Sequence, residues 1–181
     1  MFENKTVVVT GGASGIGSAL VRAFAIKGAN VCIADLDGNA AADIAREVNG
    51  IGVQCNVRKE ANICDLIAGA QDRFGPIDIF VSNAGLAQPE PDHAASASTE
   101  TWQLNWEVHV LAHVFAARLL LPEMIKRGSG HLVNVASAAG LLNQIGDAAY
   151  SASKHAAVSF AESLAITHGD DGIDVSVVCP Q

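Results

Sequence analysis

The sequence has few charged and few aromatic residues. Charged residues make up 17% of its 181 residues and aromatic residues 5%, whereas half are hydrophobic. The net charge of −8 is dispersed, with no basic stripe, which argues against nucleic acid and anionic membranes as partners. No charged-then-apolar leader opens the sequence, and no apolar run approaches the roughly 18 residues that a membrane span needs. We therefore expect a cytoplasmic protein with no membrane partner.

The sequence also lacks paired cysteines. Its four cysteines (Cys32, Cys55, Cys64 and Cys179) lie far apart without any C-x-x-C, and three of them are in or beside apolar strand-like runs. This pattern favours reduced core thiols over disulfides or zinc ligands, so we expect no metal. The length argues for a single domain over residues 1–181.

A glycine-rich turn at residues 10–17 is the most informative segment. It follows a β-branched run at 5–9 and leads into a helix-period segment at 18–24, a context typical of a dinucleotide site. Gly11 would permit the tight turn, Gly15 a close approach to a pyrophosphate, and Gly17 close packing of the helix on the strand. The helix N-terminus would then bind the anion, although such turns also serve as plain connectors.

Asp35 ends the next apolar run, 18 residues beyond Gly17. A dinucleotide fold places there the carboxylate that accepts hydrogen bonds from the adenosine ribose. Its charge would repel a 2′-phosphate, and Ser14 offers no compensating cation, so both residues favour NAD over NADP. The alternative is that Asp35 is a turn or N-cap residue opening a helix at 39–49.

The remaining chain alternates strand-like and helix-like segments. Further strands are expected at 52–57, 77–81, 131–136 and 174–179, and helices at 60–74, 99–127 and 147–168, with a late kink at Pro122. The sequence therefore predicts an α/β fold: a Rossmann-type doubly wound parallel sheet with helices on both faces. Ligands should bind at the carboxyl ends of the strands, with the irregular loop at 86–98 as part of the rim.

Three side chains are candidates for chemistry. Tyr150 and Lys154 stand four residues apart on one face of a predicted helix, and Ser137 follows the strand before it. An ammonium and an oxidised nicotinamide would favour the phenolate, so Tyr150 is a candidate general acid–base. Ser137 would hydrogen-bond the substrate oxygen, and Lys154 a ribose hydroxyl. Each signal alone is weak, because such a pair is often only an exposed face.

Together these motifs resemble the short-chain dehydrogenase/reductase family over essentially the whole chain. The matching elements occur in the family's order: Thr10-Gly11-x-x-x-Gly15-x-Gly17, Ser82-Asn83-Ala84-Gly85, Ser137, Tyr150-x-x-x-Lys154 and Cys179-Pro180. The resemblance implies hydride transfer between NAD and a secondary alcohol or carbonyl compound. It also implies a homodimer or homotetramer formed through helices 99–127 and 147–168. The cofactor contacts that it implies are Gly11, Ser14, Gly15, Ile16, Gly17, Asp35, Asn56, Val57, Asn83, Ala84, Gly85, Tyr150, Lys154 and Pro180.

The sequence departs from the family in three places. His109 stands where the family usually has an asparagine that holds a water behind the lysine; an imidazole can both donate and accept, and ordinarily titrates near neutrality. Asn56 replaces a common aspartate near the adenine, and its amide oxygen can still accept a hydrogen bond. Members usually continue beyond the sixth strand with a substrate lid and a seventh strand, which do not follow Gln181 here.

Two other functions stay open at this stage. A nucleotide-binding protein of the same fold without turnover is suggested by His109 and by the missing lid. Metal-dependent chemistry is suggested by the ligand-like spacing of His109 and His113, although Val110 stands where a zinc protease helix has its glutamate. The apolar segment 138–146 and the largely uncharged loop 86–98 favour a moderately hydrophobic substrate.

Overall fold

The computed structural model describes residues 2–89 and 92–181. These residues form one six-stranded sheet in the order β3-β2-β1-β4-β5-β6, and every neighbouring pair is parallel. The predicted doubly wound parallel sheet is confirmed. The strands are β1 (Thr6–Thr10), β2 (Asn30–Asp35), β3 (Ile51–Gln54), β4 (Ile79–Ser82), β5 (Gly130–Val135) and β6 (Ile173–Val178).

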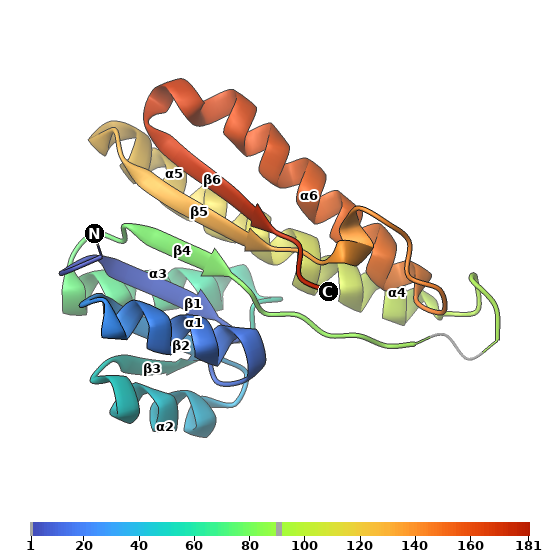
Figure 1. Cartoon of the computed structure of the whole chain (residues 1–181), viewed down its shortest axis with the longest axis horizontal. Coiled ribbons are helices and arrows are strands. Elements are labelled where there is room, and N and C mark those ends of the chain that lie inside the picture. Colours follow the sequence, from blue (N-terminus) through green and yellow to red (C-terminus); the bar gives the residue numbers. More distant parts are fainter. Residues whose placement is uncertain (1, 90–91) are drawn as a thin grey trace.

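Helices cover both faces of the sheet, and each face has its own apolar core (Figure 1). On one face α1 and α2 pack on residues such as Val7, Val9 and Ile33. On the other, α3, α5 and α6 pack on Val8, Phe80 and their neighbours. Because both faces of the central strands are buried, they read as continuous apolar runs. The helices on these faces are α1 (Gly15–Ile26), α2 (Gly38–Val48), α3 (Glu60–Phe74), α5 (Ala112–Arg127) and α6 (Ala148–His168).

The predicted helix at 99–127 is present but is not uniform. It begins as α4 (Thr99–Trp106), passes through a π-helical segment η1 (Glu107–Leu111), and continues as α5. Pro122, where the sequence predicts a kink, lies inside α5. The observed departure from α-helical geometry is η1, which precedes Pro122 in the sequence. A π segment widens the turn locally, and such segments occur frequently at functional sites.

The helix Thr99–Arg127 is also long and apolar enough to cross a membrane, with a mean hydropathy of 1.5 over its best 18 residues. This hydropathy is an average, because Glu107 and Arg118 interrupt the helix, and the sequence has no continuous apolar run of 18 residues. Half of that window is buried within the fold, where α5 packs against α3, β4 and β5. Such burial is typical of a core helix.

Candidate active site

One cavity of about 680 Å³ opens at the carboxyl ends of the strands. Residues that follow all six strands line it, together with Tyr150 and Lys154 of α6. It lies where β1 and β4 are neighbours and the strand order reverses, which is where open α/β sheets bind ligands. Every residue that the sequence predicts to contact the cofactor lines this cavity: Gly11, Ser14, Gly15, Ile16, Gly17, Asp35, Asn56, Val57, Asn83, Ala84, Gly85, Tyr150, Lys154 and Pro180.

The glycine-rich turn joins β1 to α1 and needs glycine for steric reasons. A Cβ on Gly17 would lie 2.0 Å from the carbonyl oxygen of Gly11, so any side chain there would push α1 off the turn. Gly15 has φ +49°, and a Cβ there would meet no atom within 4 Å. The turn therefore presents bare backbone to the cavity at the N-terminus of α1, where an anion is favoured.

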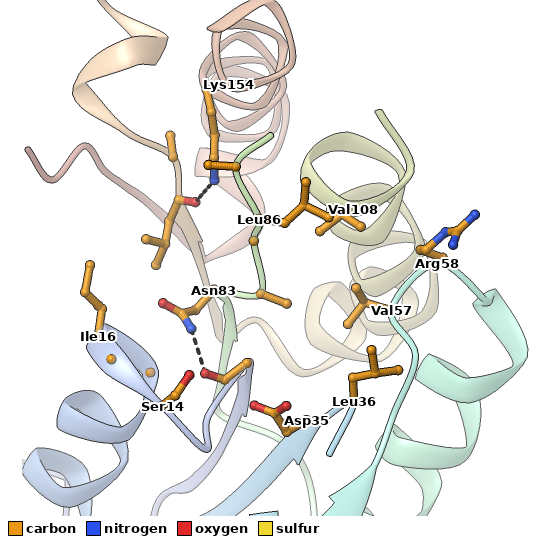
Figure 2. A pocket seen from close by; sticks show the side chains of 18 of the residues that line it. Ser14, Ile16, Asp35, Leu36, Val57, Arg58, Asn83, Leu86, Val108 and Lys154 are labelled. Atoms are coloured by element: carbon orange, nitrogen blue, oxygen red, sulfur yellow. Dashed lines mark hydrogen bonds between the residues drawn. The ribbon is translucent and has the colours of Figure 1, made fainter. Parts of the chain in front are cut away.

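Thr10 and Asn83 join this turn to the loop after β4. The Asn83 side-chain amide donates to the carbonyls of Thr10 (2.9 Å) and Gly11 (3.1 Å), and the last of these bonds is drawn in Figure 2. The Thr10 hydroxyl accepts from the backbone N–H groups of Asn83 and Ala84. In the sequence Thr10 stands only as part of a motif, and no local pattern marks its role in fixing the two loops.

Asp35 ends β2 at the floor of the cavity, opposite Lys154 in the view of Figure 2. One carboxylate oxygen accepts from the N–H of Ala13 at 3.1 Å, and the other from the N–H of Asp37 at 3.2 Å. The N-cap of α2 is Asp37, which accepts from Asn39 and Ala40. The alternative that Asp35 caps this helix is thus wrong, although Asp35 does stabilise the turn. Each of its oxygens retains lone pairs for a ligand.

Residues after β3 form the opposite wall from the glycine-rich turn (Figure 2). Val57 is buried there, and Arg58 extends from the rim to an ion pair with Glu107, the first residue of η1, with an N–O distance of 2.6 Å. Arg58 and the apolar Val108 also line the cavity, although neither is predicted from the sequence to do so. No motif marks them, because their positions depend on how η1 packs beside the segment that follows β3.

The start of α6 fixes Tyr150 and Lys154. Asp147, fully buried, caps the helix by accepting from the N–H of Tyr150 and also accepts from the N–H of Gln88 in the loop after β4. The Lys154 ammonium donates to the carbonyl of Val135 at 3.0 Å (Figure 2) and lies 5.6 Å from the Tyr150 ring centroid. Burial lowers the pKa of Lys154 to about 8, against a smaller opposing effect of Cys179.

Ser137 lies just outside this cavity. Its hydroxyl caps the short helix η2 (Ala138–Gly140) by accepting from the N–H of Ala139 at 3.1 Å. It lines a smaller hollow of about 250 Å³ that adjoins a cavity of about 640 Å³, since Asn143 and Gln144 line both. The larger one lies between residues 92–94, residues 143–146 and α6.

Residues 90 and 91 of the predicted rim lie outside the described residues.

His109 is fully buried, and both of its ring nitrogens have partners. Nε2 accepts from the N–H of Leu86 at 3.1 Å, and Nδ1 is 2.9 Å from the hydroxyl of Ser153. Since that hydroxyl donates to the carbonyl of Tyr150, Nδ1 carries the proton and donates to Ser153. Burial, then the charges of Lys154 and His113, lower the pKa of His109 to about 3. The expectation that it titrates near neutrality is therefore wrong.

The hydrogen bonds of His109 also weigh against the alternative of metal-dependent chemistry. With both nitrogens of His109 engaged, the pair with His113 offers no bidentate site. Within residues 2–89 and 92–181, no group of three histidine, cysteine, aspartate or glutamate side chains is arranged to hold a metal ion.

The comparisons with known proteins agree on one family. The family model described as short chain dehydrogenase matches residues 5–181. The chain is 38% identical to 1-deoxy-11-beta-hydroxypentalenate dehydrogenase of Streptomyces exfoliatus, over 99% of this chain and 67% of the relative. It is 35% identical to D-beta-hydroxybutyrate dehydrogenase of Cupriavidus necator, over 99% of this chain and 71% of the relative.

A solved structure of the same family is also similar to this chain. The crystal structure of a short chain dehydrogenase/reductase from Burkholderia phymatum in complex with NAD matches with a TM-score of 0.93 and 30% identity. The match covers 99% of this chain and 66% of that one. The chain thus spans about two thirds of the length of the proteins that it matches.

Proposed function

This chain belongs to the short-chain dehydrogenase family, whose members are oxidoreductases acting on CH–OH groups, and from that premise we propose that it transfers a hydride between NAD and a secondary alcohol or ketone. The observation that carries the proposal is the position of Tyr150 and Lys154. They line the same cavity as the glycine-rich turn and Asp35, although more than a hundred residues separate them in sequence.

The residues around the cavity suit NAD. The bare backbone at Gly15 and the N-terminus of α1 would hold the pyrophosphate. Asp35 would accept from the ribose hydroxyls and repel a 2′-phosphate, and Asn56 and Val57 would border the adenine. A related structure contains NAD, which supports this choice. When bound, the nicotinamide would supply the hydride donor or acceptor.

The protein's own groups would handle the proton. Tyr150 would give its hydroxyl proton to the substrate oxygen during reduction and take one back during oxidation. With a pKa of about 8, Lys154 is mainly an ammonium at pH 7, and its positive charge stabilises the phenolate that forms. Ser137 accepts from Ala139, so its own hydroxyl proton is free to donate to the substrate oxygen.

The substrate would be a largely apolar alcohol or ketone. The larger cavity beside the Ser137 hollow is bordered by the apolar Trp102 and Ile145. Polar residues line it as well, namely Asp92, His93, Asn143, Gln144, Ser151 and His155. Several relatives carry the names of dehydrogenases of cyclic or short hydroxy acids. These names support a hydroxyl-bearing substrate with an apolar body.

We further propose that the chain self-associates through helices 99–127 and 147–168 in the cytoplasm. Large apolar side chains are exposed on these two helices, which supports their role as an interface: Trp102, Trp106 and Ile166.

The test is turnover by the natural protein with NAD and a panel of secondary alcohols, followed by absorbance of the reduced cofactor. Tyr150→Phe should lower kcat about 10²–10⁴-fold, because it deletes the proton donor, and leave the Kd for NAD nearly unchanged. Ser159→Ala, on an exposed position of the same helix, serves as the control. If Tyr150→Phe kept most of the activity, the acid–base role would be wrong. NAD binding without any turnover would favour the nucleotide-binding alternative.

A further inference from the structure

Two chains of hydrogen bonds join the loop after β4 to the start of α6. The first begins at the backbone N–H of Leu86, which donates to Nε2 of His109 at 3.1 Å. Nδ1 of that imidazole donates to the hydroxyl of Ser153 at 2.9 Å, and the hydroxyl donates to the carbonyl of Tyr150 at 2.7 Å. These directions are fixed, because a carbonyl oxygen can only accept. The first chain therefore ends on the backbone of Tyr150.

The second chain begins two residues further along the same loop. The N–H of Gln88 donates to one carboxylate oxygen of Asp147 at 3.3 Å, and the N–H of Tyr150 donates to the other at 3.1 Å. Asp147 is fully buried, so solvent does not compete for these bonds. One chain ends on the Tyr150 carbonyl and the other on its N–H. Together they close a hydrogen-bonded ring through the backbone of Tyr150.

The loop and the helix are packed closely within this ring. A Cβ added to Gly85 would lie 3.4 Å from Nε2 of His109 and 3.7 Å from the side-chain nitrogen of Lys154. The rings of His109 and Tyr150 meet edge to face, with 5.3 Å between their centroids. Leu86 and Lys154 both line the large cavity (Figure 2). The ring of bonds therefore sets the separation of the loop and α6 at the cavity wall.

That separation matters for a proton donor. Gly85, Leu86 and Ala87 of the loop line the same cavity as Tyr150, so a ligand between them must fit both. Proton transfer needs the donor within hydrogen-bond reach of the reacting atom. A displacement of about 1 Å can cost about 10²-fold in rate even when its cause lies outside the reacting groups. Bonds to the Tyr150 backbone are a direct way to prevent such a displacement.

We propose that Asp147 and Ser153 are positioning residues that hold Tyr150 against the loop after β4. Asp147 bonds the loop directly, whereas Ser153 acts through His109. Neither Asp147 nor Ser153 is among the residues that line the large cavity, so each acts through Tyr150. The ring of bonds does not depend on the proposed function, but its effect on turnover rests on it.

Amide hydrogen exchange of the full chain, followed by NMR, tests the ring without turnover. Asp147→Asn has one oxygen in place of two, and asparagine caps helices as well as aspartate, so it should keep Tyr150 and lose Gln88. Asp147→Ser, which is too short to reach the loop, should do the same. The Gln88 amide should then exchange about tenfold faster, while that of Ala13, bonded to Asp35, stays unchanged. Unchanged exchange at Gln88 in both variants would overturn the proposal.

The chain through Ser153 has a closely matched control. Ser153→Ala removes the hydroxyl that holds His109, so the Leu86 amide should exchange faster. Ser151→Ala makes the same change two residues earlier on α6. Ser151 is also 2% exposed, but its hydroxyl accepts from the N–H of Gln144, so the Leu86 amide should exchange as in the unmodified protein. Equal effects of the two variants would contradict the ring.

Turnover separates positioning from stability. Asp147→Asn and Ser153→Ala should each lower kcat about 10–100-fold, because Tyr150 is displaced, and leave KM for NAD nearly unchanged. Val158→Ala removes buried methyl groups from the same helix outside the ring. It should lower the urea midpoint without lowering kcat.

Three outcomes of the turnover test are distinct. Ser153→Ala changes no charge, so a loss of kcat in Asp147→Asn alone would assign the effect to the missing carboxylate and refute the positioning role. A kcat that only follows the urea midpoint, in Val158→Ala as in the other variants, would refute it as well. An enzyme without turnover in any form would count against the proposed function alone, since the exchange rates would still decide whether the ring holds Tyr150.

Discussion

Asp35 combines two duties in one side chain. Its carboxylate accepts from Ala13 and Asp37, so it holds the glycine-rich turn against the end of β2, and the same charge faces the cavity. Removal of the charge and removal of the hydrogen bonds are therefore separable effects.

We predict that Asp35→Ala combined with Ser14→Arg narrows or reverses the preference for NAD over NADP. The change removes a repulsive charge and adds a cation that can pair with the 2′-phosphate. Asp35→Asn with Ser14→Arg is the sharper variant, because the amide can still accept one of the two bonds. Titration of both cofactors should show the ratio of their Kd values moving toward NADP by at least about tenfold, or ~1.4 kcal/mol. Equal affinity for both cofactors in the unmodified protein would refute the assignment of Asp35 to the ribose.

His109 gives a second prediction at this scale. Because its pKa is about 3, it stays neutral throughout the working range, and we predict no kinetic pKa near neutrality from this group. His109→Asn should leave any limb of the kcat profile between pH 5 and 8 in place. It should lower stability by about 1 kcal/mol, since an amide cannot serve both Leu86 and Ser153 as the imidazole does. Disappearance of a limb near pH 6.5 would show that the imidazole titrates there.

At the scale of the element, the helix 99–127 buries two imidazoles, one within the segment that departs from regular α geometry and one just after it. The η1 segment places His109 against the loop after β4, and α5 then buries His113 one turn later. Both imidazoles are neutral in the fold, whereas in the unfolded chain they bind a proton near pH 6.5.

We predict acid lability from this helix. Between the unfolded value of about 6.5 and the folded value of about 3, the unfolded chain binds more protons, so stability falls as pH falls through this window. The slope is up to about 1.4 kcal/mol per pH unit for each histidine. Urea unfolding at pH 7, 6, 5 and 4 should show a shallower decline for His113→Leu. Val110→Ala, a buried neighbour without a titrating group, should shift the curve without changing its slope.

Sequence patterns predicted the strands and most helix bounds because a parallel sheet buries both faces of its strands and leaves long apolar runs. The residues that the family resemblance implies as cofactor contacts line one cavity, because parallel strands all end at the same edge. Sequence patterns could not predict the π-helical segment η1. Neither the residues of η1 nor Pro122 indicate where a helical turn widens to include an extra residue. Nor could sequence patterns show that Asp37 rather than Asp35 caps α2, or that both ring nitrogens of His109 have partners, because both depend on packing between distant elements.

At the scale of the whole molecule, the exposed side chains on α4 and α6 bear on assembly. Trp106 is 47% exposed, a large apolar area for a solvent-facing helix. We predict that Trp106→Glu shifts a dimer or tetramer toward monomer, because the interface would then bury an unpaired charge. Light scattering after size-exclusion chromatography measures this, with Lys27→Glu beside α1 as the control. A monomeric unmodified protein at high micromolar concentration would rule out this interface.

The cavity is built from segments that follow each of the six strands, from Gly11 to Pro180. A ligand held there binds only a chain in which all six strands are in place, so binding and folding are thermodynamically linked. At a free concentration of a hundred times Kd, such a ligand would add about 2.7 kcal/mol to the free energy of unfolding. NAD would therefore protect amide hydrogens against exchange across the whole sheet, β3 and β6 at its two edges included, rather than only in the loops that it touches.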